Sequence, residues 1–274
     1  MALGTWTSEA EQGAELSRWV RRARGGDAVT GARLITVAGG KGGVGKSNFC
    51  LNFGLALAAR GLRVRLVDCD AGLGSLDVLL GMTPRGHLGQ VLAGCALEEV
   101  ELAGPLGVRI VPAPPEVWEA GLAPVGEALL AAVLAAGVDV VLLDAGGGLG
   151  EGVRSLLALG REVVVVTTPE PTALADAYAT LKAVRHANAS APVGLVLNLV
   201  ECAGDGEAAF RAVASVCRSY LDWSPVYVGA IPRDPAVRRA VRAQRPLLLD
   251  APQAPAARAL RQLASEFGAR GPGA

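Results

Sequence analysis

Residues 39–47 read Gly39-Gly40-Lys41-Gly42-Gly43-Val44-Gly45-Lys46-Ser47, and this stretch decides the fold. From Gly40 to Ser47 it satisfies the pattern G-x-x-x-x-G-K-[ST], between a β-branched run at Leu34–Val37 and a helical pattern from Asn48. Glycines allow backbone N–H groups to wrap closely around phosphate oxygens, because they adopt φ values that other residues resist. The helix N-terminus adds its partial positive charge. The stretch therefore predicts a phosphate-binding loop formed by residues 40–47.

Two side chains at the end of this loop carry its chemistry. Lys46 is expected to reach the β- and γ-phosphates of a nucleotide, and the Ser47 hydroxyl is expected to ligate Mg²⁺. The alternative is a glycine-rich turn that only joins a strand to a helix. The complete pattern in its strand, loop and helix context favours the phosphate loop.

The rest of the chain alternates short apolar runs with helical patterns. The expected strands are Leu34–Val37, Val64–Val67, Val108–Val111, Val138–Leu143, Val163–Thr167, Val193–Leu199 and Val226–Ile231. The expected helices include Asn48–Ala59, Val125–Ala135, Thr172–His186 and Glu207–Tyr220, while Pro112–Pro124 is expected to be a surface loop. This alternation predicts an α/β fold with a doubly wound, mainly parallel sheet and helices on both faces. Aromatic residues make up only 4% of the chain, so Val, Leu and Ala must build the core.

Composition excludes several classes of protein. The 26 basic and 26 acidic side chains balance, so no global charge draws the chain to nucleic acid or membrane. The five cysteines are scattered without a C-x-x-C pair, which argues against a disulfide framework or a zinc site. No signal peptide and no apolar run of about 20 residues is apparent, so a cytoplasmic location is expected. The expected organisation is an N-terminal extension (1–31), one domain (32–267) and a disordered tail (268–274).

Three acidic residues follow two of the expected strands. Asp68 and Asp70 come after Val64–Val67, on one side of the chain near the crevice where open α/β sheets bind ligands. They can hold Mg²⁺ through water or polarise water, unless they are merely solvated loop acids. Asp144 ends the run of Val140–Leu143 and is expected to hold Mg²⁺ through its water shell. The predicted metal site is therefore Ser47, Asp68 and Asp144.

The second lysine of the loop makes the motif more specific. The run K-G-G-V-G-K-S at Lys41–Ser47 resembles the deviant Walker A motif of the MinD/ParA family of ATPases. The resemblance implies an ATP-dependent homodimer in which Lys41 reaches across the interface to the partner's nucleotide. The stretch Asp68–Asp77 resembles the first switch segment of that family, which implies that Asp70 orients or activates the attacking water and that Asp68 lies near the metal. Ser75 stands where the family usually has Asn, and Ala145 where it commonly has Ser or Thr.

Two later segments resemble the family's adenine pocket. Asn198 occupies the position of the Asn that reads adenine, and Ile231-Pro232-Arg233-Asp234 resembles the segment that lines the other side of the base. The resemblance implies that Asn198 and Pro232 bind adenine; taken alone, Asn198 could also be a helix or turn cap. No N-K-x-D stretch specifies guanine. The expected cofactors are ATP and Mg²⁺.

Four stretches resemble one branch of the family, the flagellar-number regulator FlhG (also called YlxH or FleN). They are Lys46–Phe49 with Leu51-Asn52, Leu76–Gly81, Thr167–Ala173 and Asp234–Val241. This resemblance implies an ATPase switch that controls the number or placement of flagella through flagellar partner proteins. The alternatives are a cell-division site-selection or DNA-partitioning ATPase, and an ATP-binding scaffold that has lost hydrolysis.

The two ends of the chain are relevant to the binding of protein partners and membranes. Ser8 and Glu11 form a capping box that predicts a helix to about Arg24. Its Glu11-Gln12 pair resembles, imperfectly, the activator helix of FlhG, which implies that Gln12 enters the nucleotide site of the GTPase FlhF; alternatively the helix docks on its own core. Ala256–Phe267 is expected to be the last domain helix, and the tail beyond it is too short for an interfacial helix. Membrane binding is therefore expected to be weak or absent, with any membrane location transient and through partners.

The basic residues near the end are all arginines. Arg238, Arg239, Arg242 and Arg245 are interpreted as an exposed helix face, with lipid, DNA or a protein partner as alternatives. Nucleic-acid binding is not expected.

Overall fold

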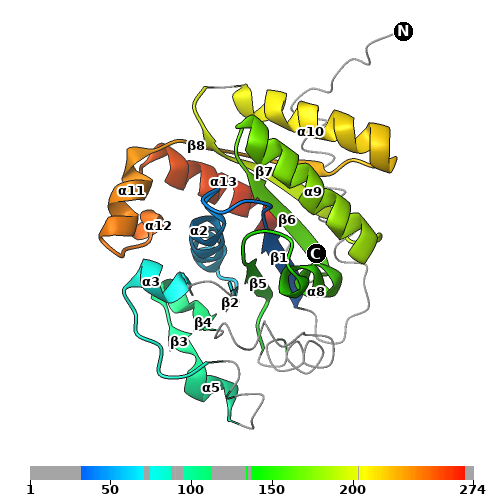
Figure 1. Ribbon diagram of the computed structural model, residues 1–274. Coiled ribbons are helices and arrows are strands. Elements are labelled where there is room, and N and C mark those ends of the chain that lie inside the picture. Colours follow the sequence, from blue (N-terminus) through cyan, green and yellow to red (C-terminus); the bar gives the residue numbers. More distant parts are fainter. Residues whose placement is uncertain are drawn as a thin grey trace.

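The computed structural model describes residues 32–70, 75–87, 90, 95–112, 134, 137–202 and 204–268. Three predictions fall outside these residues: the N-terminal extension with Gln12, nearly all of the expected loop and helix between Ala113 and Ala135, and the tail beyond Gly268. The described residues form one sheet with helices on both of its faces (Figure 1).

The sheet has eight strands in the order β3-β4-β2-β5-β1-β6-β7-β8. Their bounds are β1 Arg33–Ala38, β2 Val64–Cys69, β3 Leu102–Ala103, β4 Arg109–Val111, β5 Val140–Ala145, β6 Glu162–Thr167, β7 Val193–Val200 and β8 Val226–Pro232. All the described pairings are parallel except that of β3 with β4. The doubly wound, mainly parallel α/β fold is thus confirmed, and each of the seven expected strands corresponds to an observed one.

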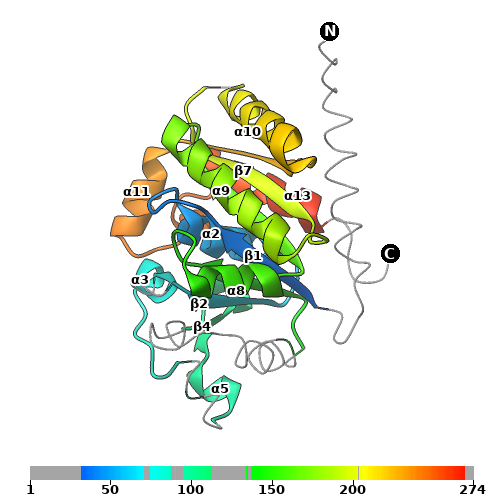
Figure 2. The same ribbon diagram turned by 45° about the vertical axis from the view of Figure 1, so that its right-hand side comes forward.

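Helices cover the sheet on both sides (Figure 2). Successive valines of β6 face opposite ways: Val164 and Val166 pack into one core cluster, and Val163 and Val165 into the other. The first cluster lies under α2 Lys46–Ala58, α11 Pro235–Arg242, α12 Leu247–Asp250 and α13 Pro255–Gly268. The second lies under α8 Glu151–Leu159, α9 Pro171–Ala187 and α10 Asp205–Leu221. The short helices α3 Leu76–Leu80 and α5 Leu97–Val100 and the 3₁₀ turn η1 Pro105–Gly107 accompany β2, β3 and β4. Since both faces are covered, the strands β2, β5 and β6 are buried from end to end.

The central strand β1 lies between β5 and β6, and the chain leaves it through the phosphate loop into α2. Because the strands are parallel, the carboxyl ends of β1, β2, β5, β6, β7 and β8 lie at one edge of the sheet. Open α/β sheets bind ligands at this edge, where the strand order reverses. The fold therefore brings every predicted site residue that the structure describes to the same edge.

At the opposite edge of the sheet, where the strands begin, a buried ion pair joins β1 to β6. Arg33, the first residue of β1, donates from Nε and Nη2 to the Glu162 carboxylate at 2.8 and 2.7 Å. Its guanidinium lies 3.8 Å from the centre of the Phe267 ring, and Nη1 donates to the Phe267 carbonyl at 3.1 Å. These contacts join the starts of β1 and β6 to the end of α13.

None of the helices in the described part of the chain combines the length and the hydropathy that crossing a bilayer requires.

Candidate nucleotide site

The phosphate loop is open where a ligand would lie. A Cβ added at Gly42 or Gly43 would meet no described atom within 4 Å. Gly43 and Gly45 have φ values of 83° and 89°, which glycine adopts without the strain that other residues meet. Gly45 caps α2, and no side chain accepts the first N–H groups of that helix. The backbone donors of the loop and of the helix N-terminus are thus available to an anion.

The back of the loop is packed tightly against neighbouring strands and helices. A Cβ at Gly39 would lie 2.8 Å from the Val166 carbonyl oxygen, and one at Gly40 would collide with the Asp176 carbonyl. A Cβ at Gly45 would collide with the Asn198 amide nitrogen. These three glycines allow the loop to sit close to β6, α9 and β7, so its shape is fixed from behind.

Asn198 holds the loop rather than pointing into open space. Its Nδ2 donates to the Val44 carbonyl at 2.8 Å, and the residue is only 9% exposed. This contact joins the end of β7 to the phosphate loop. The adenine-reading role of Asn198 stays a prediction, and the contact with Val44 gives the side chain a second, structural role.

The two lysines of the loop lie in opposite environments. Lys46 is buried, and its aliphatic chain lies beside Gly39. Its Nζ would be 3.8 Å from a Cβ at Gly147, so the ammonium group lies near the segment that follows β5. Lys41 is 45% exposed; its Nζ donates to Thr172 Oγ1 at 3.3 Å and lies 3.9 Å from the Glu170 carboxylate. Lys46 is therefore built into the site, while Lys41 is at the surface.

Asp144 is the most unusual carboxylate of the site. It lies at the carboxyl end of β5 with 0% exposure, and neither of its oxygens has a hydrogen-bond partner of normal geometry among the described residues. Burial raises its pKa to about 7; the neighbouring Asp68 and Asp70 add to the rise, and Ser47 and Lys46 oppose it. A buried, unpartnered carboxylate beside a serine hydroxyl is the donor set that a hard cation such as Mg²⁺ takes.

Asp68 lies beside Asp144 on the adjacent strand, since the two residues are register partners in β2 and β5. Its carboxylate accepts backbone N–H groups from Asp70 at 3.0 Å, Ser75 at 2.7 Å and Leu76 at 3.0 Å. Burial raises the pKa of Asp68, and these three hydrogen bonds oppose the rise. Asp68 therefore fixes the start of α3, and its predicted role at a metal stays a prediction.

Asp70 links the segments that follow β2 and β5. A Cβ at Gly146 would lie 2.9 Å from the Asp70 Oδ1, so the two segments touch at this point. Ala145 is fully buried. The arrangement places the Asp70 carboxylate beside the segment that follows Asp144.

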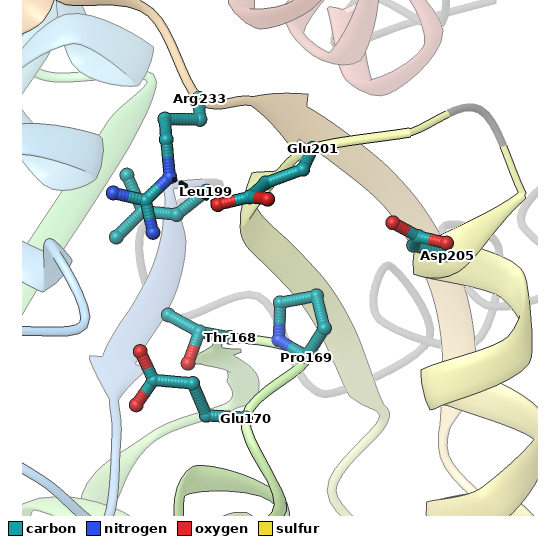
Figure 3. A pocket seen from close by; sticks show the side chains of 7 residues that line it. All are labelled: Thr168, Pro169, Glu170, Leu199, Glu201, Asp205 and Arg233. Carbon is teal, nitrogen blue, oxygen red and sulfur yellow. Dashed lines mark ion pairs between the residues drawn. The ribbon is translucent and has the colours of Figure 1, made fainter.

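A cavity of about 280 Å³ lies at the ends of β6, β7 and β8 (Figure 3). Its lining comprises Thr168, Pro169, Glu170, Leu199, Glu201, Asp205 and Arg233. Within this lining Glu201 and Arg233 form an ion pair, with 3.0 Å between the carboxylate and the guanidinium. Leu199 adopts a left-handed φ of 58° at an irregularity between β7 and β8, an uncommon conformation for a residue other than glycine.

The sequence indicated this region through Asn198 and the segment Ile231-Pro232-Arg233-Asp234; of these residues Arg233 lines the cavity, and Asn198 and Pro232 do not. Its acidic and basic walls were not predicted.

Taken together, the described residues fit a phosphorylated ligand with a divalent cation. The open amides at Gly42 and Gly43 and the Lys46 ammonium suit phosphate oxygens, and Ser47 with Asp144 suits the cation. No group of three or more His, Cys, Asp or Glu side chains in the described residues could hold a metal alone. This is expected where phosphates and water complete the coordination.

Comparison with known proteins agrees with this reading. The family model that matches residues 31–267 is that of ParA, described as NUBPL iron-transfer P-loop NTPase. The antiactivator FleN of Pseudomonas aeruginosa is 38% identical over 239 residues, which cover 85% of each chain. The flagellum site-determining protein YlxH of Helicobacter pylori is 31% identical over 80% of this chain and 76% of its own.

A similar solved structure is the septum site-determining protein MinD from Pyrococcus horikoshii, in complex with Mg-ADP. It is 27% identical, has a TM-score of 0.72, and the match covers 86% of this chain and 95% of that one.

Proposed function

This chain belongs to the ParA family of P-loop NTPases, and we propose that it is an ATPase switch that controls the number or placement of flagella. The observation that carries the enzymatic part is the buried Asp144 carboxylate, unpartnered beside Ser47 and Lys46 at the mouth of an open phosphate loop. We assign residues 32–267 to the ATPase domain.

The proposed binding of Mg-ATP uses three groups at the start of α2 and the end of β5. Lys46 and the loop amides hold the phosphates, while Ser47 and Asp144 hold the cation, Asp144 through its water shell. When bound, Mg²⁺ neutralises charge that develops on the transferred phosphate. Asp144 is deprotonated when the cation binds, because a carboxylate must lose its proton to serve a metal.

Hydrolysis is assigned to two further residues. Asp70 orients the attacking water, since its carboxylate lies where the segments after β2 and β5 meet. Lys41 serves the nucleotide of a second subunit, which its exposed position allows. In this arrangement ATP joins two copies of the chain, and hydrolysis separates them.

We place the adenine base at the cavity beside Pro232 and Arg233. A purine base needs a flat apolar wall and a few polar contacts, and Leu199, Pro169 and Glu201 offer both. An ionised carboxylate such as Glu201 accepts hydrogen bonds only, and it can accept one from the exocyclic amine of adenine.

The flagellar part of the proposal rests on two relatives. Similarity to FleN and YlxH extends over 85% and 80% of the chain, so it involves the whole domain and not the phosphate loop alone. Other flagellar proteins are the expected partners. The GTPase FlhF is the proposed partner of the N-terminal segment, through Gln12.

Two other functions remain as alternatives, each with an observation in its favour. A cell-division switch is favoured by the similarity to MinD of Pyrococcus horikoshii, at a TM-score of 0.72. A binding scaffold without hydrolysis is favoured by Ser75, whose hydroxyl is buried without a hydrogen-bond partner in the described residues, and by Ala145.

Two measurements test the proposal. Phosphate release from ATP, measured with the full chain and Mg²⁺, separates an ATPase from a scaffold. Deletion of the gene in its host, followed by counting flagella on single cells, tests the biological role. Altered counts that wild type restores, and the Lys46→Ala variant does not, support the proposal. Normal flagella with a division or DNA-partitioning defect would overturn it.

A further inference from the structure

The outer face of α11 concentrates positive charge. Ala236 and Ala240 of this helix are buried, whereas Arg238, Arg239, Arg242 and Arg245 at and just beyond its end are exposed. At 100° per residue Arg238, Arg239 and Arg242 fall within an arc of about 100°, and Arg245 follows the end of the helix, after Gln244 with its left-handed φ of 51°. We call these four residues the arginine face.

The arginine face is not balanced by the chain itself. Within the part of the chain that the structure describes, Arg238, Arg239 and Arg242 have no ion pair, and Arg245 lies 3.6 Å from Asp250. Like charges three and four residues apart on a helix repel each other and weaken it. The whole chain is neutral, with 26 basic and 26 acidic residues, so this charge is local. This local positive charge does not stabilise the folded chain.

Exposed apolar side chains lie beside the arginine face. Val241 on α11 is 39% exposed, and Leu249 on the adjacent α12 is 40% exposed. Val78 on α3 is 55% exposed, and its carbonyl accepts a hydrogen bond from Gln244 Nε2 at 3.0 Å. The side chain of Gln244 thereby joins the end of α11 to α3. The three helices form a continuous surface that is both basic and apolar.

We propose that this surface of α3, α11 and α12 docks an acidic, amphipathic segment of a partner protein. Guanidinium groups pair with carboxylates in a planar, bidentate way, and the exposed Val and Leu side chains match an apolar stripe on the same segment.

The exposed apolar side chains disfavour other occupants. Val78, Val241 and Leu249 are exposed on this surface, and the phosphate backbone of nucleic acid offers them no apolar partner. The three apolar side chains come from three separate helices, whereas insertion into a bilayer uses the apolar face of one continuous helix.

The helices of this surface begin beside the nucleotide site. The first N–H groups at the start of α3 are held by the Asp68 carboxylate, 2.7 Å from Ser75 N and 3.0 Å from Leu76 N. The helix α11 begins at Asp234, which caps it at 2.9 Å and directly follows Arg233 of the cavity. The helices α3 and α11 thus begin at segments that belong to the nucleotide site, and this part of the argument rests on the proposed function.

The test uses the full chain and three fluorescent probes. They are a synthetic helical peptide with Glu on one face and Leu on the next, random-sequence duplex DNA, and phosphatidylglycerol vesicles. The variant Arg238→Ser/Arg242→Ser is compared with Arg211→Ser, which removes an exposed arginine from α10 on the other face of the sheet. A Val241→Ser variant tests the apolar part.

The peptide is expected to bind wild type and Arg211→Ser equally. The double variant should bind it about tenfold more weakly, since two exposed ion pairs are lost. Val241→Ser should also weaken binding, and the melting temperature of the double variant should be no lower than that of wild type. ATP affinity, measured by calorimetry, should be unchanged.

Unchanged peptide binding by the double variant overturns the proposal. Arginine-dependent binding of the DNA or the vesicles, without binding of the peptide, also overturns it in favour of a phosphate-bearing partner. Failure of wild type to bind ATP would count against the proposed function instead, and the peptide measurements would still decide on the surface.

Discussion

The burial of Asp144 predicts that this carboxylate, which is proposed to hold the cation, lowers the stability of the ligand-free protein. Its pKa rises from an ordinary value of 3.8 to about 7, chiefly through burial. The folded state therefore binds this proton more tightly than the unfolded state does. Stability is lost as pH rises from the unfolded to the folded pKa, and the penalty is complete above about pH 7. Asp144→Asn removes the charge and keeps the shape, so it should stabilise the ligand-free protein at pH 8.

The size of the effect follows from the shift. About three pKa units at about 1.4 kcal/mol each give roughly 4 kcal/mol as an upper figure. Relaxation around the charge and its coupling to Asp68 reduce the figure, so a gain of about 1–3 kcal/mol is expected. A domain of this size would melt several degrees higher. Mg²⁺ with ADP should reverse the order, because only the wild-type carboxylate can hold the cation.

Thermal melting of both proteins between pH 5 and pH 8, with and without Mg-ADP, measures these effects. Asp139→Asn is a control of opposite sign, because a hydrogen bond from Arg63 lowers the pKa of Asp139. Asp139 thus contributes stability above its unfolded pKa that is lost as pH falls, and its Asn variant should melt lower at pH 8. If Asp144→Asn melts lower than wild type at pH 8 without ligand, the account of the buried charge is wrong.

Three further predictions concern the phosphate loop and its neighbours. Lys46→Ala should abolish ATP binding in calorimetry, whereas Lys41→Ala should bind ATP but fail to dimerise in light scattering; equal losses of affinity would remove the distinction between the buried and the exposed lysine. Asp70→Ala should bind ATP and remain dimeric, with phosphate release lower by on the order of 10²–10⁴; loss of binding would make Asp70 a structural residue or a metal ligand. Gly45→Ala should lose nucleotide binding, because its Cβ collides with Asn198 at a φ of 89°. Gly61→Ala, with a similar φ of 87° and free space around its Cβ, should lose only about 1 kcal/mol of stability and bind nucleotide normally.

Much of the fold follows from local pattern. The valine-rich runs of β5, β6 and β7 are buried on both faces, so the sequence marks them as continuous apolar stretches. The two-residue strand β3 and the helix α8 were not predicted. Strand β3 exists only through its pairing with β4, and α8 follows a glycine-rich segment that gives no clear helical signal before Glu151. The pairing of β3 is a tertiary contact that no local window contains, whereas α8 has a local signal in its buried Val153, Leu156 and Leu157, which lie at i, i+3 and i+4.

The residues that form the site were predictable from the sequence, but their contacts were not. The loop from Gly40 to Ser47 and the acids Asp68 and Asp144 were placed at one edge of the sheet by their motifs and strand ends. The sequence could not show that Asp68 accepts three backbone N–H groups, nor that Asn198 donates to the Val44 carbonyl. Both contacts join segments that are distant in sequence or depend on the path of a loop.

The two edges of the sheet differ in how their polar groups are satisfied, and this difference suits a switch. At the amino edge Arg33 and Glu162 neutralise each other with two hydrogen bonds, and removing one partner of such a buried pair costs about 3–5 kcal/mol. At the carboxyl edge the Asp144 oxygens have no hydrogen-bond partner of normal geometry among the described residues, and Leu199 has a left-handed backbone. A ligand that satisfies the second edge stabilises the folded chain in proportion to its binding energy. The polar groups at the amino edge of the sheet are therefore satisfied without a ligand, whereas those at the carboxyl edge, where ATP is proposed to bind, are not. Nucleotide binding can thus change the energy of the segments around Asp68 and Asp144 without unfolding the domain.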